Sequence, residues 1–168
     1  LEVGEKRIID WLLDDLESSG VERTVVVSNH KFIDQFEAWG KERNNVTVLD
    51  DGSEDNDHRL GAVKDIEFAI EKAHINDDIV VLAGDNVLDF SLSSFIEYGR
   101  KKNASCIMRH EEKDMDKLRK TGVIVIDENE KVMEMEEKPK EPKSIWAVPP
   151  FYYYIKEDAK LIKEGISS

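Results

Sequence analysis

The sequence has little cysteine, no long apolar run and a shortage of positive charge. Cys106 is the one cysteine among 168 residues, so no disulfide can form within the chain. The apolar run "ASCIM" around it is typical of a small buried side chain in a reducing compartment. The chain has 24 lysines and arginines and 37 aspartates and glutamates, which gives a net charge of −13. Because no segment gathers basic residues into a stripe, a nucleic-acid partner is not expected.

The ends of the chain and its hydropathy show no targeting signal. No apolar run approaches the roughly 20 residues that a membrane span requires, and the opening "LEVGEKRIIDW" lacks a signal-peptide pattern. We therefore expect a cytoplasmic protein without a membrane partner. The chain begins with Leu1 rather than methionine, so we also expect that its first structural element is missing.

Helical and strand patterns alternate in the first half of the chain. Apolar residues at helical spacing predict helices over residues 5–19, 31–43 and 60–74. Short β-branched runs predict strands at residues 23–28, 45–50 and 79–82, the last buried on both faces. This rhythm predicts an α/β fold: a three-layer α/β/α sandwich with a mostly parallel, Rossmann-like sheet.

The second half of the chain continues with a different pattern. We expect a helix over 91–102, a strand over 104–110 and a charged helix over 111–120. Strands over 121–127 and 131–139 should follow, joined by a tight turn, and then a strand interrupted by prolines over 145–155. A final helix over 156–164 should end at Gly165. No linker or repeat divides the chain, so residues 1–168 are expected to form a single domain.

The first candidate site is the stretch "VVLAGDNVLDF", in which a carboxylate follows a strand. Ligands of open α/β sheets bind outside the carboxyl ends of the strands, and Asp85 falls at such an end. A carboxylate there suits Mg²⁺, which takes one or two protein oxygens and completes its shell with water and phosphates. The alternative is an Asx turn in which Asp85 and Asn86 only close the strand. The residues alone leave both interpretations open.

The second candidate site is "EEKP", residues 136–139. Here Lys138 could neutralise a phosphate while Glu137 accepts hydrogen bonds from sugar hydroxyls. The alternative is a solvated charge cluster before a proline turn.

Other polar and aromatic clusters are explained by structure alone. The four histidines, His30, His58, His74 and His110, lack metal-ligand spacing and are expected at the surface. The aromatic run at residues 151–154 should alternate between the faces of a strand and pack in the core. The acidic loop 50–57 lacks the spacing of a calcium-binding loop and is expected to be solvated.

Taken in order, the motifs resemble one family. The segments "LEVGEKRIIDWLLDDL", "RTVVVS", "RLGAVKDIEFAI", "VVLAGDNVLDF", "GVIVIDENEKVMEMEEKPKEPKS" and "FYYYI" follow one another as in sugar-1-phosphate nucleotidyltransferases. The run resembles glucose-1-phosphate thymidylyltransferases and related pyrophosphorylases over nearly the whole chain. The resemblance implies the nucleotide-diphospho-sugar transferase fold, with a nucleoside triphosphate and a sugar 1-phosphate as substrates. It implies a nucleotide-sugar and pyrophosphate as products, and it leaves a homo-oligomer open.

The resemblance also implies roles for particular residues. Asp85 would hold Mg²⁺, Lys138 would pair with the sugar phosphate, and Glu137 would bind sugar hydroxyls. The remaining substrate-binding positions are Gly84 and Asn86 of the "GDN" motif, Gly122, whose missing Cβ lets the sugar approach, and Leu60 and Gly61 beside the nucleobase.

Departures from the family pattern limit these expectations. The family's opening strand and glycine-rich loop would precede Leu1, and its second metal-binding aspartate would follow the last residue. Pro149 and Pro150 stand where relatives commonly have a glycine near the sugar. We therefore expect these 168 residues alone to be inactive. The rival hypothesis is a non-catalytic nucleotide-sugar-binding or regulatory assembly module of the same fold. A glycosyltransferase would need a metal-binding acidic pair that "GDN" does not supply.

Overall fold

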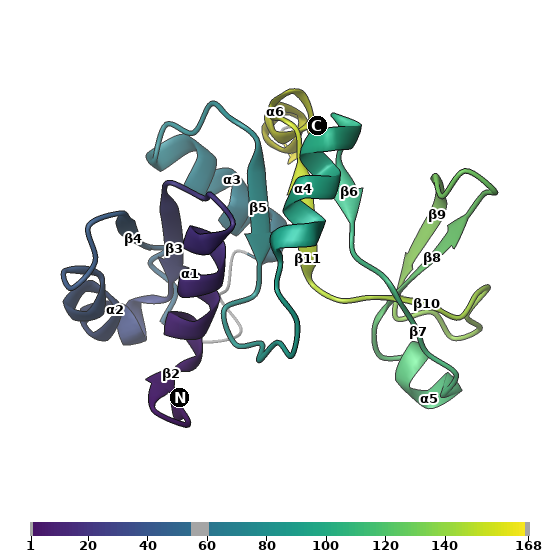
Figure 1. The fold of residues 1–168 in the computed structure, drawn as a ribbon, viewed down its shortest axis with the longest axis horizontal. Coiled ribbons are helices and arrows are strands. Elements are labelled where there is room, and N and C mark those ends of the chain that lie inside the picture. Colours follow the sequence, from purple (N-terminus) through teal and green to yellow (C-terminus); the bar gives the residue numbers. More distant parts are fainter. Residues whose placement is uncertain (1, 55–60, 167–168) are drawn as a thin grey trace.

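A computed structural model describes residues 2–54 and 61–166, with side chains described as far as residue 162. Two regions are visible in Figure 1. The first, which we call the α/β body, comprises residues 8–54, 61–107 and 151–166. The second, the β lobe, comprises residues 110–148 and is inserted between two strands of the body. Two short chain links, 108–109 and 149–150, join them.

The body contains two small sheets. Strands β3 (Thr24–Ser28) and β4 (Val46–Asp50) pair in parallel. In the other sheet, β11 (Phe151–Tyr154) lies between β5 (Ile79–Leu82) and β6 (Cys106–Ile107) and is antiparallel to both. The expected parallel pairing is thus present in β3 and β4. Strand β11 differs because the chain re-enters the body from the lobe without a crossover helix, which a parallel strand would require.

Helices cover both faces of the body. Helices α1 (Ile8–Ser18) and α4 (Ser93–Lys102) contact one another, as do α3 (Ala62–Lys72) and α6 (Lys156–Ile166). Helices α4 and α6 both pack on β11, from the front and the back of the view in Figure 1. Helix α2 (Ile33–Gly40) follows the 3-10 turn η1 (His30–Phe32) and packs on β4. The three-layer α/β architecture is therefore confirmed.

The main hydrophobic core lies between α1, α4 and β11. It consists of Leu16, Leu92, Ile96, Phe151 and Tyr153. Phe151 and Tyr153 are buried while Tyr152 and Tyr154 are half-buried, so the predicted alternation of the aromatic run is confirmed. Strand β5 is half-buried rather than buried on both faces. One reason is that β5 pairs with β11 alone among the described strands, which leaves its other edge open.

A buried carboxylate joins α1 to α2. Asp10 is 7% exposed. Its Oδ1 accepts hydrogen bonds from Trp39 Nε1 at 2.8 Å and from Arg43 at 3.0 Å, and its Oδ2 accepts one from Arg7 Nε at 2.7 Å. Burial alone would raise the pKa of Asp10, but these three donors outweigh it and hold the pKa at about 2.

The β lobe is an antiparallel sheet with one short helix. Its strands lie in the order β7 (His110–Glu111), β10 (Trp146–Val148), β8 (Gly122–Ile126) and β9 (Val132–Glu137). Helix α5 (Met115–Leu118) precedes β8. The buried cluster of the lobe is small: Leu118, Val123 and Ala147.

Several element boundaries differ from the sequence-based expectation. The first helix begins at Ile8 instead of residue 5, because β2 (Lys6–Arg7) forms a hairpin with β1 (Glu2–Val3). The strand expected over 104–110 is divided into β6 in the body and β7 in the lobe. The charged helix is limited to α5, whose N-terminus is capped by the Asp114 side chain. The final helix runs past Gly165 to Ile166. None of the described helices combines the length and apolarity needed to cross a bilayer.

Candidate functional site

Asp85 lies in an exposed turn directly after β5. The side-chain amide of Asn86 donates hydrogen bonds to the Ala83 carbonyl at 3.1 Å and to Asp85 Oδ1 at 3.3 Å. These bonds close the turn locally, through an amide donor rather than the side-chain acceptor of an Asx turn, and the Asp85 carboxylate remains accessible to solvent. A Cβ built on Gly84 would meet no atom within 4 Å, so the described surroundings do not require a glycine there.

The structure brings Gly122 and Glu137 together in the β lobe. Gly122 opens β8 and pairs with Glu137 of β9 on one side and with Val148 of β10 on the other. A Cβ on Gly122 would lie 3.3 Å from Glu137 Oε2 and 3.5 Å from the Val148 Cβ. A larger residue would therefore fill the space in front of the Glu137 carboxylate. The expectation that Gly122 allows a close approach is compatible with this geometry.

Lys138 adjoins the same corner of the lobe. Its backbone N–H donates a hydrogen bond to the Thr121 carbonyl at 3.0 Å. Its Nζ lies 3.8 Å from Glu137 Oε1, and both side chains are about two-thirds exposed, at 65% and 66%. An accessible cation and an accessible carboxylate thus stand side by side, which suits a ligand that carries both a phosphate and hydroxyl groups.

Strand register places the two candidate segments at the same crossing between body and lobe. Leu82, the last residue of β5, pairs with Phe151 of β11. Val148, the last residue of β10, pairs with Gly122, and only Pro149 and Pro150 separate β10 from β11 (Figure 1). The turn after β5 and the Gly122 corner therefore flank one two-residue link.

The charge of the lobe's Glu137 also acts on a side chain of the body. Burial raises the pKa of the Tyr152 phenol, and the nearby negative charge of Glu137 raises it further. Within residues 2–54 and 61–166, no hydrogen bond or ion pair joins Asp85 to Glu137 or Lys138. The two segments converge on one crossing without touching.

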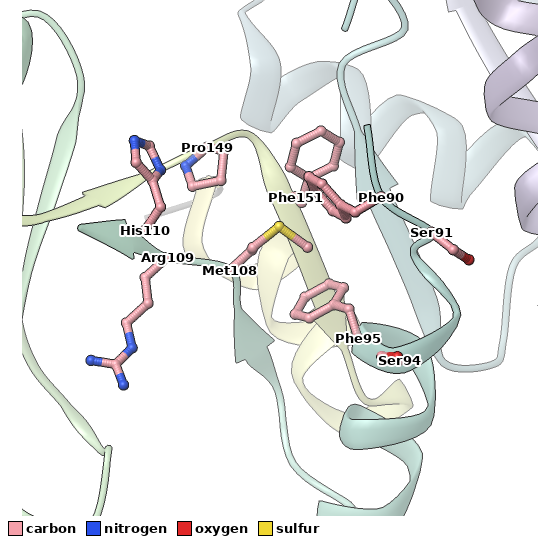
Figure 2. A pocket seen from close by; sticks show the side chains of 9 residues that line it. All are labelled: Phe90, Ser91, Ser94, Phe95, Met108, Arg109, His110, Pro149 and Phe151. Carbon is pink, nitrogen blue, oxygen red and sulfur yellow. The ribbon is translucent and has the colours of Figure 1, made fainter. Parts of the chain in front are cut away.

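A cavity of 470 Å³ lies beside this crossing. Figure 2 shows that its wall comes from three segments: the start of α4, the link after β6, and the link before β11. The lining residues are Phe90, Ser91, Ser94, Phe95, Met108, Arg109, His110, Pro149 and Phe151. The predicted site residues do not line it. Sequence reasoning missed this cavity, because its apolar side chains come from separate segments and form no motif.

Gly61, one of the two predicted nucleobase positions, lies at the start of α3. Gly61 precedes the helix with φ of +90°, a conformation that only glycine adopts readily. A Cβ there would meet no described atom within 4 Å, so backbone conformation rather than crowding explains the glycine. Leu60 lies outside the described residues.

The carboxyl end of the parallel strand pair carries an ion pair. His30 Nδ1 and Asp50 Oδ2 are 2.6 Å apart. The hydrogen bond to Asp50 raises the pKa of His30, and the hydrogen bond to His30 lowers the pKa of Asp50. His30 is exposed, as expected. Its described partner is the Asp50 carboxylate.

The donor set can be tested against the predicted Mg²⁺ site. Across the two described stretches, 2–54 and 61–166, no three histidine, cysteine, aspartate or glutamate side chains are grouped as a metal site. Asp85 offers one carboxylate. Mg²⁺ is often bound by one or two carboxylates when substrate phosphates and water supply the other ligands. Asp85 fits such a site only together with a phosphate-bearing substrate.

Comparison with known proteins identifies the family. A sequence model described as nucleotidyl transferase matches residues 1–166. The chain belongs to the nucleotidyl transferase family. The resemblance found in the motifs is thereby confirmed.

Two of the relatives are named for reactions of glucose 1-phosphate. The chain is 27% identical, over 92% of its length, to a UTP–glucose-1-phosphate uridylyltransferase of Haloferax volcanii. It is 31% identical, over 84% of its length, to a glucose-1-phosphate adenylyltransferase of Fervidobacterium nodosum. These matches cover 61% and 37% of the two relatives. The chain thus spans less than two thirds of the curated relatives it matches.

Solved structures of nucleotidyl transferases share the fold. A UDP-glucose pyrophosphorylase complexed with UDP-glucose superposes with a TM-score of 0.80 at 18% identity, covering 98% of this chain and 70% of the other. The expected fold class is confirmed by this likeness. The predicted site residues remain predictions, since their roles require measurement.

Proposed function

We propose that the whole protein transfers a nucleotidyl group from a nucleoside triphosphate to a sugar 1-phosphate. An oxygen of the sugar phosphate attacks the α-phosphorus of the triphosphate. The new phosphorus–oxygen bond forms as the bond to pyrophosphate breaks, so the products are a nucleotide-sugar and pyrophosphate. No covalent enzyme intermediate is required, and catalysis rests on orientation and charge neutralisation.

One observation carries the proposal: both candidate segments flank the Pro149–Pro150 link. The turn bearing Asp85 follows the β5 residue that pairs with Phe151, and the Gly122 corner is paired with Val148. A substrate lying across this crossing would meet the Asp85 carboxylate from the body and the Lys138 ammonium group from the lobe. Two phosphate-bearing substrates need positive charge at such a junction, which Lys138 supplies directly and Asp85 would supply through a bound Mg²⁺.

Each side chain has a task in this proposal. Lys138, exposed beside Glu137, binds the sugar phosphate as a compact cation. Glu137 accepts hydrogen bonds from sugar hydroxyls, and the missing Cβ of Gly122 leaves room for the sugar ring in front of that carboxylate. Asp85 would hold Mg²⁺, with Gly84 and Asn86 shaping its turn. When bound, Mg²⁺ supplies positive charge that neutralises the phosphates.

We propose that the activity belongs to the whole protein, in the cytoplasm, and that these 168 residues alone are inactive. Among the described strands, β3 pairs only with β4 and β5 only with β11, so each keeps an unpaired edge. An unpaired edge leaves backbone N–H and C=O groups that a neighbouring strand could pair with. They support a further strand in the whole protein, which would bring the triphosphate-binding loop expected from the family.

The second candidate function is a non-catalytic module that binds nucleotide-sugars or assembles with an enzyme. The observation in its favour is the turn at Asp85, which Asn86 closes through Ala83 with no need of a metal. In that case Asp85 would be a turn residue, and the exposed charges of Glu137 and Lys138 would serve binding only.

The test is pyrophosphorolysis by the complete reading frame. The protein is given Mg²⁺, pyrophosphate and a panel of nucleotide-sugars, and triphosphate release is measured. We expect release from at least one member of the panel. Asp85→Asn should abolish it, because the neutral amide cannot hold the metal, whereas Lys138→Ala should chiefly weaken use of the sugar phosphate.

Matched controls separate these roles from general damage. Asp89→Asn removes another exposed carboxylate of the same loop, and Lys131→Ala removes another exposed lysine of the lobe. Both should behave as the unaltered protein does. Full Mg²⁺-dependent activity in Asp85→Asn would refute the metal assignment. A folded protein that releases no triphosphate from any panel member would favour the binding module.

A further inference from the structure

The "EEKP" turn has a backbone conformation that its own sequence disfavours. Lys138 has φ of +48°, in the left-handed region where residues with a Cβ are uncommon. Pro139 follows directly, and a proline favours an extended conformation in the residue before it. Local preference therefore opposes the observed conformation twice. Contacts from outside the turn must hold Lys138 in place.

Two hydrogen bonds bracket the strained residue. The Lys138 N–H donates to the Thr121 carbonyl at 3.0 Å. Two residues further on, the Lys140 carbonyl accepts a hydrogen bond from Arg119 Nε at 3.1 Å. Arg119 and Thr121 both belong to the short segment between α5 and β8. One segment thus holds the turn on both sides of Lys138.

Arg119 is itself fixed to the lobe. Its Nη1 donates to Asp116 Oδ1 at 3.0 Å, within the same helical turn. Leu118, the residue before it, is fully buried in the lobe's core. The Arg119 side chain is 48% exposed, so it spans from this anchor across the surface to the turn. The guanidinium group therefore connects the packed part of the lobe to the backbone beside Lys138.

We propose that Arg119 is a positioning residue that holds Lys138 in its left-handed conformation and so aims the ammonium group at the sugar phosphate. This inference rests on the proposed function and assigns a residue to it outside the "GDN" and "EEKP" motifs. Arg119 touches no substrate in this proposal. Its hydrogen bond to the Lys140 carbonyl fixes the backbone of the turn. That backbone sets the direction in which the Lys138 side chain points.

The first measurement is hydrogen–deuterium exchange of the whole protein without substrate. In Arg119→Ala, the amides of residues 137, 138, 140 and 141 should exchange faster, because the turn loses one of the two hydrogen bonds that hold it. The control Lys117→Ala removes an exposed cation of the same helix, whose only described contact is with Glu112 at 3.7 Å, and should leave the exchange unchanged. Equal exchange in Arg119→Ala and the unaltered protein would overturn the positioning role.

The second measurement is steady-state kinetics with the sugar 1-phosphate that the panel identifies. Arg119→Ala should raise the KM for that substrate about 10- to 100-fold, since misplacement of a charge-pairing group weakens its contact. The KM for the triphosphate should stay the same. Arg119→Lys retains a cationic donor group without the planar fork of the guanidinium and should recover part of the loss. Uniform loss for both substrates, with a lowered unfolding midpoint, would indicate a structural role instead.

A double-mutant cycle then asks whether Arg119 acts through Lys138. In the Lys138→Ala background, Arg119→Ala should change the KM little further, because the group it positions is gone. If the two substitutions raised the KM independently, so that their fold-changes multiplied in the double variant, the proposal would be overturned. If the unaltered protein turns over no panel member, the proposed function fails and this inference falls with it. An active protein in which Arg119→Ala has normal kinetics overturns the positioning role alone.

Discussion

The α/β body and the β lobe hold their halves of the candidate site in different ways. The body has five fully packed core side chains and a buried carboxylate with three donors, yet its candidate residue, Asp85, stands in a turn closed only by its neighbours. The lobe's core cluster has three members, with Ile124 and Val148 also buried, yet its Lys138 is held by contacts from another segment. The better-packed region thus carries the more loosely constrained site residue. The position of a site residue depends on its own immediate contacts and not on the size of the nearby core.

The largest difference between the two regions is expected when a buried side chain is truncated in each core. Ile96 in the body and Leu118 in the lobe are 1% and 0% exposed, and truncation of either to alanine should cost about 2–5 kcal/mol. The lobe has about 40 residues, which is near the lower limit for independent folding. We therefore expect Ile96→Ala to lower hydrogen-exchange protection in both regions and Leu118→Ala to lower it chiefly in the lobe. Equal loss in both regions from both variants would show a single cooperative unit.

Acid should weaken the body more than the lobe. The pKa of Asp10 is about 2 when folded and close to 4 when unfolded. Its stabilisation is therefore present above pH 4 and is lost as the pH falls toward 2, a change of about 2 kcal/mol. Urea unfolding from pH 5 to pH 2 should show the free-energy difference between Asp10→Asn and the unaltered protein shrinking by that amount.

The matched control for Asp10 is an exposed ion pair of the lobe. Lys143 Nζ lies 2.5 Å from Glu134 Oε2, with both side chains 53% exposed. Exposed pairs contribute about 0–1 kcal/mol, so Glu134→Gln should change the acid dependence much less than Asp10→Asn does. A larger effect from Glu134→Gln would reverse the comparison.

A pair of glycines extends the comparison to the addition of a single methyl group. A Cβ on Gly99 of α4 would lie 2.5 Å from a ring carbon of the buried Tyr153. Overpacking costs about 1–3 kcal/mol, and the gain in helix propensity offsets about 1 kcal/mol of it. In the lobe, a Cβ on Gly122 meets the flexible end of Glu137 at 3.3 Å. Gly99→Ala should lower the unfolding midpoint, while Gly122→Ala should keep stability and impair sugar use. Both interpretations would be refuted if Gly122→Ala lowered the unfolding midpoint while Gly99→Ala kept stability and impaired sugar use.

The body could be predicted from the sequence in most of its elements. Apolar periodicity located α1 to α4 and strands β3 to β5, because regular elements that bury one face must repeat their apolar residues. The division of residues 104–110 between β6 and β7 could not be predicted. A continuous β-propensity pattern does not reveal that the chain leaves one sheet for another at Met108 and Arg109. The antiparallel pairing of β11 with β5 and β6 could not be predicted either, because the local sequence does not indicate strand direction.

The candidate site could be predicted only as motifs. Sequence order located Asp85 after a strand and Lys138 after another, and register explains why both segments reach the same link. The φ of Lys138 and the hydrogen bond from Arg119 to Lys140 could not be foreseen. Both depend on a tertiary contact between residues 21 positions apart, for which the local sequence carries no signal.

The insertion of the β lobe into the body has a consequence for the order of events during synthesis. Strand β11 lies between β5 and β6 but is made after both and after the whole lobe. Until residue 154 has left the ribosome, β5 and β6 have no strand between them, and Phe151 and Tyr153 are missing from the core. The lobe's own strands are complete by Val148. The main core therefore cannot close before β11 is made, whereas every strand of the inserted sheet is available earlier, and the two halves of the candidate site are joined only at that last step.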